Sequence, residues 1–126
     1  MARHRPDVSV FAGVPLFDGY PGRQLAPLAR HADRLVVTSG TPLAQERSHA
    51  HEVVVILTGE AVVVRDGLEI GRLGPGDVVG AREELAGVPH DATVLAGSGL
   101  SALVLTGPAF RWAARSLPGF AIPAAA

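Results

Sequence analysis

Three histidines of the sequence have the residue type and spacing of metal ligands. His49 and His51 are separated by one residue, and in a β-strand the side chains of residues i and i+2 point to the same face. His90 follows a glycine-containing stretch and could supply a third imidazole. Three imidazoles can hold a divalent metal ion and leave one coordination position open, so these histidines are candidate metal ligands.

Other patterns of catalytic or cofactor-binding residues are absent from the sequence. The chain has no cysteine, which excludes thiolate metal sites and a cysteine nucleophile. Gly74 and Gly76 lack the third glycine of a dinucleotide-binding fingerprint, and no serine lies in the Gly-x-Ser-x-Gly pattern of hydrolases. The neighbouring carboxylates Glu83 and Glu84 are interpreted as solvated surface charges. We therefore expect that the protein is not an enzyme.

The composition favours a single soluble domain without a nucleic-acid or membrane partner. The chain has 126 residues, is 48% hydrophobic and carries a formal net charge of -1, which fits one compact core. Its 11 basic residues are all arginines, scattered among 12 acidic residues, and they form no basic stripe for nucleic acid. The sequence contains neither a run of about 18 apolar residues nor a secretory leader, which predicts a cytoplasmic protein.

Residues 8–33 are predicted to form a helical N-terminal segment. From Leu25 onward, apolar residues recur with the i, i+3, i+4, i+7 spacing of a one-sided helix. Because Pro27 would cost about 3 kcal/mol inside a helix, we expect this helix to start near Gln24. The preceding N-terminus, which includes Arg3 and His4, is expected to be frayed.

From residue 34 to residue 107 the pattern changes to short β-branched runs. Strands are predicted at 52–58, 61–64, 68–73, 77–79, 92–96 and 101–106, and turn residues such as Asp66 and Gly67 separate them. Such a succession is typical of an antiparallel β-roll or jelly-roll barrel. Residues 108–118 resume a helical pattern, and residues 119–126 form a tail. The expected fold is mainly β, a roll flanked by short N-terminal and C-terminal helices in one domain, residues 1–126.

Several short motifs, taken together, resemble the cyclic nucleotide-binding domain family. In chain order they are residues 14–17, 39–43, 55–60, 73–77 with Gly80, 87–89, 92–94 and the helix around Phe110. The family includes the effector domains of catabolite-activator-type regulators and the regulatory subunits of kinases. The resemblance implies a double-stranded β-helix fold, a role as a sensor or regulatory domain, and a cyclic nucleotide such as cAMP or cGMP as ligand.

The same resemblance implies where a ligand would bind. In the family, a short helix after the glycine at position 80 directs its backbone N–H groups at the cyclic phosphate. A second segment, one turn later in the roll, supplies an arginine and further backbone contacts. The implied ligand-binding positions are Val79, Gly80, Ala81, Arg82, Glu83, His90, Asp91, Ala92 and Thr93.

Three of these positions depart from the family pattern. Ala81 replaces a glutamate that holds the ribose 2′-hydroxyl, His90 replaces the arginine that pairs with the phosphate, and Asp91 replaces a small residue. Two lost hydrogen bonds to charged groups, at about 1.5–3 kcal/mol each, would weaken binding by about two to four decades. Asp91 adds like-charge repulsion, for which Arg82 could compensate in part. Because His90 gains charge in mild acid, phosphate binding would strengthen from pH 8 to pH 6.

These observations leave three functional alternatives. The first is a sensor domain that binds a cyclic nucleotide or another small anion weakly. The second is a ligand-free module for protein interaction or homo-oligomerisation, whose apolar tail, residues 117–126, docks on a partner. The third is a metal-binding protein similar to cupins, for which the three histidines are the candidate ligands; against it, the glutamate that cupins carry falls on Val55 or Ile56. No other cofactor is implied.

Overall fold

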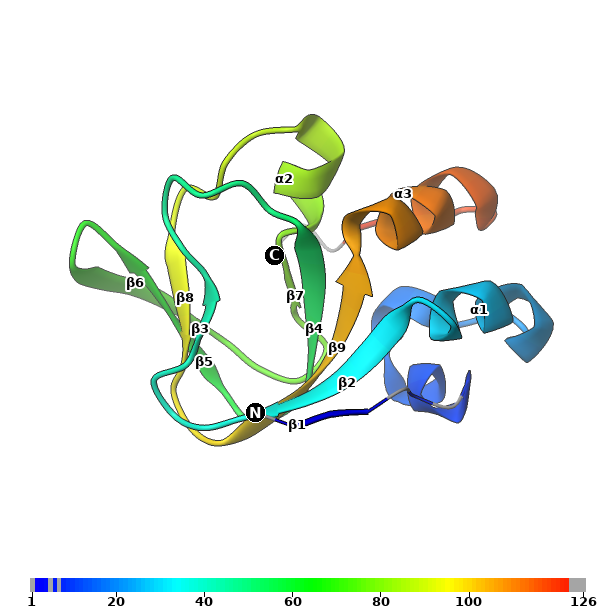
Figure 1. The fold of residues 1–126 in the computed structure, drawn as a ribbon, viewed down its shortest axis with the longest axis horizontal. Coiled ribbons are helices and arrows are strands. Elements are labelled where there is room, and N and C mark those ends of the chain that lie inside the picture. The colour runs from blue at the N-terminus through cyan, green and yellow to red at the C-terminus, as the bar shows by residue number, and fades with distance from the viewer. Residues whose placement is uncertain (1, 5, 7, 123–126) are drawn as a thin grey trace.

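The computed structural model describes residues 2–4, 6 and 8–122, which form a β-roll with a layer of helices at one side (Figure 1). The roll consists of two antiparallel sheets. The larger one contains, in spatial order, β1 (Ala2–His4), β2 (Ala32–Val37), β9 (Leu100–Thr106), β4 (Glu52–Thr58) and β7 (Val78–Val79). The smaller one contains β3 (Pro42–Ala44), β8 (Thr93–Ala96), β5 (Ala61–Arg65) and β6 (Leu68–Leu73). The mainly β fold expected from the sequence is confirmed.

The helices occur in three places along the chain: before β2, between β7 and β8, and after β9. Two short 3₁₀ helices, η1 (Val8–Gly13) and η2 (Pro15–Phe17), precede α1 (Gly22–Ala29). Helix α2 (Ala81–Ala86) follows β7, and α3 (Gly107–Ser116) follows β9. The side chain of Thr106 caps α3 by accepting a hydrogen bond from the backbone N–H of Ala109. No helix among the described residues has the length and hydropathy needed to span a bilayer.

The central strands β4 and β9 are buried on both faces. On β4, Val53 and Val55 pack with the helices, whereas Val54 and Ile56 pack into the roll interior. Strands that are covered on both sides read as continuous apolar runs instead of alternating patterns. The sheet therefore connects two cores, one below the helices and one inside the roll.

The β5–β6 hairpin has the two-residue turn that the sequence predicts. Arg65 pairs with Leu68, and the turn residues Asp66 and Gly67 have φ values of 51° and 82°. Both central residues of a type I′ turn need positive φ, which explains the Asp-Gly pair.

Two predictions for the N-terminal segment are wrong. Helix α1 starts at Gly22, not near Gln24, and it contains Pro27. The proline removes only the hydrogen bond to the Arg23 carbonyl, and burial of Leu25 and Leu28 offsets this loss. Residues 2–4 are not frayed, since β1 pairs with β2 along its whole length, whereas Arg5 lies outside the described residues.

The described part of the C-terminal tail packs against aromatic residues of the same chain. The Phe120 ring lies 6.1 Å from the Phe17 ring and 5.7 Å from the Phe110 ring. The Tyr20 hydroxyl donates a hydrogen bond of 2.6 Å to the Pro118 carbonyl. Part of the apolar surface of residues 117–122 is therefore used inside the chain; docking of the tail on a partner stays a prediction, and residues 123–126 lie outside the described residues.

Candidate functional site

Gly80 forms the junction between β7 and α2. Its φ is 88°, in the left-handed region that favours glycine, and it stands at the N-terminal cap of α2. A Cβ atom at this position would lie 3.1 Å from the Glu52 carbonyl oxygen and 3.3 Å from His90 Cε1. The backbone angle therefore favours glycine at this position, and the close approach to His90 leaves little room for a Cβ atom.

A cavity of about 200 Å³ lies inside the roll beside this junction. Its lining brings together both predicted ligand-binding segments, and consists of Val63, Leu73, Val78, Val79, Gly80, Glu83, His90 and Val94. Apart from the polar side chains of Glu83 and His90, the lining is apolar, and it includes no arginine. The volume is below the range of about 300–1,000 Å³ that is typical of small-molecule pockets.

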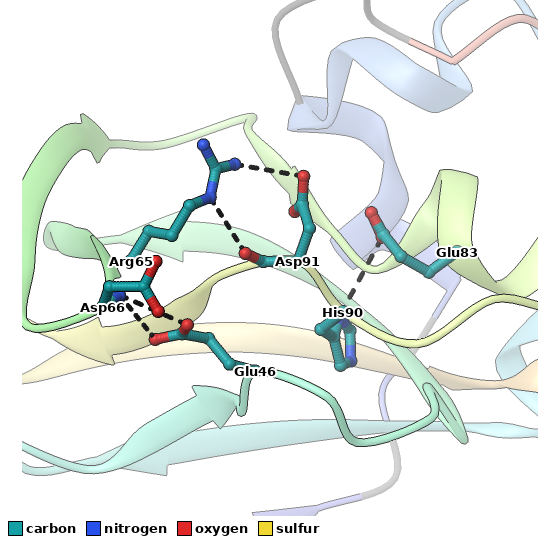
Figure 2. Close-up of polar contacts among 6 residues, drawn as sticks. All are labelled: Glu46, Arg65, Asp66, Glu83, His90 and Asp91. Carbon is teal, nitrogen blue, oxygen red and sulfur yellow. Dashed lines mark hydrogen bonds and ion pairs between the residues drawn. The ribbon is translucent and has the colours of Figure 1, made fainter.

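Glu83 and His90 face each other in this cavity (Figure 2). His90 Nδ1 lies 3.9 Å from Glu83 Oε2, and the two side chains are only 10% and 23% exposed. Glu83 comes from α2, and His90 comes from the segment before β8. The polar end of the cavity thus offers one imidazole and one carboxylate, so an entering anion would meet a negative charge beside the histidine.

Asp91 points away from the cavity and is paired with Arg65. Arg65 Nε donates to the Asp91 backbone oxygen at 3.0 Å, and Arg65 Nη2 donates to Asp91 Oδ2 at 3.1 Å (Figure 2). The Asp91 side chain is 80% exposed. Because the carboxylate is neutralised outside the cavity, the expected repulsion from Asp91 is smaller than its sequence position suggests. The negative charge that does line the cavity belongs to Glu83.

The remaining predicted positions do not line the cavity. Ala81 is buried in the core below the helices, Ala92 is also buried, and Arg82 is exposed on α2. The Thr93 hydroxyl accepts a hydrogen bond from the backbone N–H of Glu46 at 3.1 Å and donates to the Glu46 carboxylate at 3.3 Å. Of the nine predicted positions, Val79, Gly80, Glu83 and His90 line the cavity.

A second hollow, of about 430 Å³, contains all three candidate metal ligands. Its lining consists of Pro42, Leu43, Ala44, Gln45, Ser48, His49, His51, Glu52 and His90. The backbone of His90 is fixed to the opposite loop: its N–H donates to the Ser48 oxygen at 2.9 Å, and its oxygen accepts from the Arg47 N–H at 2.8 Å. Within the described part of the chain, however, no group of three or more His, Asp or Glu side chains has an arrangement that could hold a metal ion.

Glu84 has a role that sequence reasoning missed. Its side chain is only 7% exposed and forms an ion pair with Arg111 of α3, so it is not the solvated charge that we expected. A Cβ atom at Gly107 would lie within 2.7 Å of Glu84 Cδ, so the absence of a side chain there makes room for the carboxylate. The contact depends on how α2 packs against α3, and no local pattern in the sequence signals it.

A family model described as "Cyclic nucleotide-binding domain" matches residues 34–116. A cAMP-binding acyltransferase from Mycobacterium smegmatis is 27% identical to the chain, with a TM-score of 0.76 over 90% of this chain and 36% of the acyltransferase. A cyclic nucleotide-binding-like protein from Brucella abortus is 25% identical, with a TM-score of 0.70 over 87% of this chain and 98% of that protein.

A third structure shares the fold at lower identity. The regulatory subunit of a cAMP-independent protein kinase A from Trypanosoma brucei is 20% identical, with a TM-score of 0.73 over 79% of this chain and 37% of the subunit. The chain therefore spans well under half the length of this subunit and of the acyltransferase. No curated protein matches the chain.

Proposed function

We propose that this chain, which belongs to the cyclic nucleotide-binding domain family, is a non-catalytic regulatory domain whose roll binds a cyclic nucleotide or another small anion only weakly. The observation that carries the proposal is the pair of Glu83 and His90 inside the roll cavity. The family resemblance implies a phosphate-binding arginine at position 90, and the chain has instead an imidazole there, facing a carboxylate.

Two physical effects weaken the binding of a phosphate here. An arginine contributes a charge-assisted, forked hydrogen bond to phosphate, worth about 1.5–3 kcal/mol, and the imidazole of His90 has no such fork of donors. Glu83 also competes with the phosphate for the imidazole, because both are anions. The ribose contact is missing as well, since Ala81 has no polar side-chain atom and is buried.

The side chains of the cavity, and not the fold, are the basis of this proposal. Solved structures with the same fold are described both as cAMP-binding, for the Mycobacterium smegmatis acyltransferase, and as cAMP-independent, for the Trypanosoma brucei regulatory subunit. Both descriptions apply to much longer chains. The domain proposed here would act by passing ligand occupancy to a partner or to a linked domain.

The proposal is tested by calorimetric titration and thermal shift with cAMP, cGMP and inorganic phosphate. The wild-type domain is expected to respond only at millimolar ligand, and Glu83→Ala is expected to bind the nucleotides several-fold more tightly because the competing carboxylate is gone. Asp18→Ala, which removes an exposed carboxylate between η2 and α1, is the matched control and should behave as wild type. A ligand at a hundred times its Kd would stabilise the fold by about 2.7 kcal/mol.

Two results would overturn the proposal. Submicromolar binding of a nucleotide by the wild-type domain would show that the cavity is not weakened. The absence of any stabilisation by these ligands in both wild type and Glu83→Ala would favour the second candidate, a ligand-free interaction module. That candidate is supported by the hydrophobic side chains exposed on the surface, of which Leu68 and Ile70 on β6 are 70% and 50% exposed.

A further inference from the structure

The outer edge of the smaller sheet carries exposed hydrophobic side chains. Strand β6 ends the order β3-β8-β5-β6, and within the described residues its strand partner is β5. Leu68 is 70% exposed and Ile70 is 50% exposed. In Figure 1 the β5–β6 hairpin projects from the side of the roll that lies away from α1 and α3. An edge strand of this kind presents backbone groups and apolar side chains to a further strand.

The sequence of β6, Leu-Glu-Ile-Gly-Arg-Leu, is self-complementary in charge. When two such strands pair antiparallel about a two-fold axis between Ile70 and Gly71, Glu69 of each copy lies opposite Arg72 of the other. Opposite charges that face each other across an antiparallel ladder stabilise the pairing, and like charges destabilise it. The strand therefore fits a second copy of itself in one register.

A bulge places the two charged side chains on the same face of the sheet. Gly71 pairs with Val63 and Glu69 pairs with Val64, which leaves Ile70 as the extra residue. Arg72 pairs with Val62, and because Val62 and Val64 are two residues apart on β5, Glu69 and Arg72 share one face. Within one chain, Arg72 Nε already lies 3.4 Å from Glu69 Oε2. Two paired copies would form a cluster of four alternating charges.

We propose that two copies of this chain associate through antiparallel pairing of β6 to form a symmetric dimer. Growth stops at two copies, because the other edge of this sheet is the three-residue strand β3, which begins with Pro42 and lacks that N–H donor. A six-residue edge buries less surface than the roughly 1,200–2,000 Å² of standard interfaces, so the association is weak and depends on protein concentration. The dimer does not rest on nucleotide binding by the roll.

The test is sedimentation velocity over a concentration series with charge-reversed variants. The wild type is expected to shift from monomer to dimer as concentration rises. Glu69→Arg alone and Arg72→Glu alone should each weaken self-association about ten-fold or more, because every dimer then contains two like-charge pairs. An equal mixture of these two variants should dimerise again, since each interface pair is then of opposite sign. The double variant Glu69→Arg with Arg72→Glu should also dimerise.

The exposed position of both side chains makes the variants suitable for this test. Glu69 and Arg72 are 51% and 61% exposed, so their substitution leaves the core intact, and circular dichroism checks the fold. Asp18→Arg, a reversal of an exposed carboxylate between η2 and α1, is the matched control and should dimerise as wild type. A wild type that stays monomeric at all concentrations would overturn the proposal. So would single variants that dimerise normally, or a mixture that stays monomeric.

Discussion

His90 is the residue on which the proposed weak nucleotide binding chiefly depends. Its side chain is nearly buried, faces Glu83 and touches the backbone at Gly80, where the family resemblance places the phosphate. An arginine there would offer a permanent charge and a fork of donors that matches a phosphate, and an imidazole has no such fork. Under the proposed function, the side chain at this position sets how strongly the polar end of the cavity attracts a phosphate.

Replacing His90 with arginine is expected to tighten cAMP binding about ten- to a hundred-fold. The reason is that the guanidinium keeps its charge and forms forked hydrogen bonds to phosphate, which contribute about 1.5–3 kcal/mol. The gain should be larger when His90→Arg is combined with Glu83→Ala, because the carboxylate would otherwise pair with the new arginine. Isothermal titration calorimetry measures both affinities. His49→Arg, which adds the same side chain in the second hollow, is the control and should not tighten binding. A His90→Arg variant that binds cAMP no better than the wild type would contradict the role assigned to His90.

At the scale of elements, α2 is attached to α3 by a buried carboxylate. Glu84 extends from α2 into the space left by Gly107 and pairs with Arg111, whose side chain is 44% exposed. Both ends of α2 carry glycines with left-handed backbone angles, Gly80 and Gly87, so the helix is joined to the strands through flexible residue types. The ion pair thus fixes the position of the helix that contributes Glu83 to the cavity.

Removal of Arg111 is expected to destabilise the domain by about 1–3 kcal/mol, because a buried carboxylate would lose its partner. Arg111→Ala tests this in urea unfolding experiments at pH 7. Arg115→Ala removes an exposed arginine from the same helix and should change the stability by less than about 0.5 kcal/mol. Replacing both members of the pair with leucine should cost less than Arg111→Ala alone. Equal stabilities of the two alanine variants would mean that the pair does not hold α2.

Elements that are stabilised locally are those that the sequence predicts well. The run at β4 and the Asp-Gly turn before β6 are evident from residue types alone, because β-branched residues and positive φ leave clear patterns. The strands β1 and β3 are short and exist only through pairing with β2 and β8, which are distant in sequence. Helix α1 starts earlier than the sequence predicts for a similar reason, since core packing outweighs the cost of Pro27.

In the candidate site, too, some features follow from local sequence patterns and others depend on contacts between distant residues. The positions of Gly80 and His90 around one cavity follow from motif spacing, and the structure brings them together. The direction of individual side chains depends on partners elsewhere in the chain. Asp91 points outward and pairs with Arg65, and Glu84 lies between α2 and α3 and pairs with Arg111. Neither contact has a local sequence signal.

At the scale of the whole molecule, the helical layer and the roll form one unit because they share the sheet between them. Residues of β9 illustrate this: Leu103 and Leu105 belong to the core below the helices, and Ala102 and Val104 belong to the roll interior. Neither core can lose its packing without exposing one face of the same strands. Small domains built in this way usually unfold in a single transition.

A substitution at Phe120, near the C-terminus, tests whether the helical layer and the roll unfold as one unit. Its ring packs on Phe17 and Phe110, so Phe120→Ala is expected to cost about 1–3 kcal/mol, less than the loss of a fully buried ring. Trp112, the only tryptophan, reports on α3 by fluorescence, and far-ultraviolet circular dichroism reports on the whole domain. Both signals should shift together in urea to the same lower midpoint, and Leu85→Ala, at an exposed site on α2, should leave it unchanged. If the fluorescence transition of Phe120→Ala moved alone, the helices would be a separate unit, and ligand occupancy in the roll could not be passed to them through a shared core.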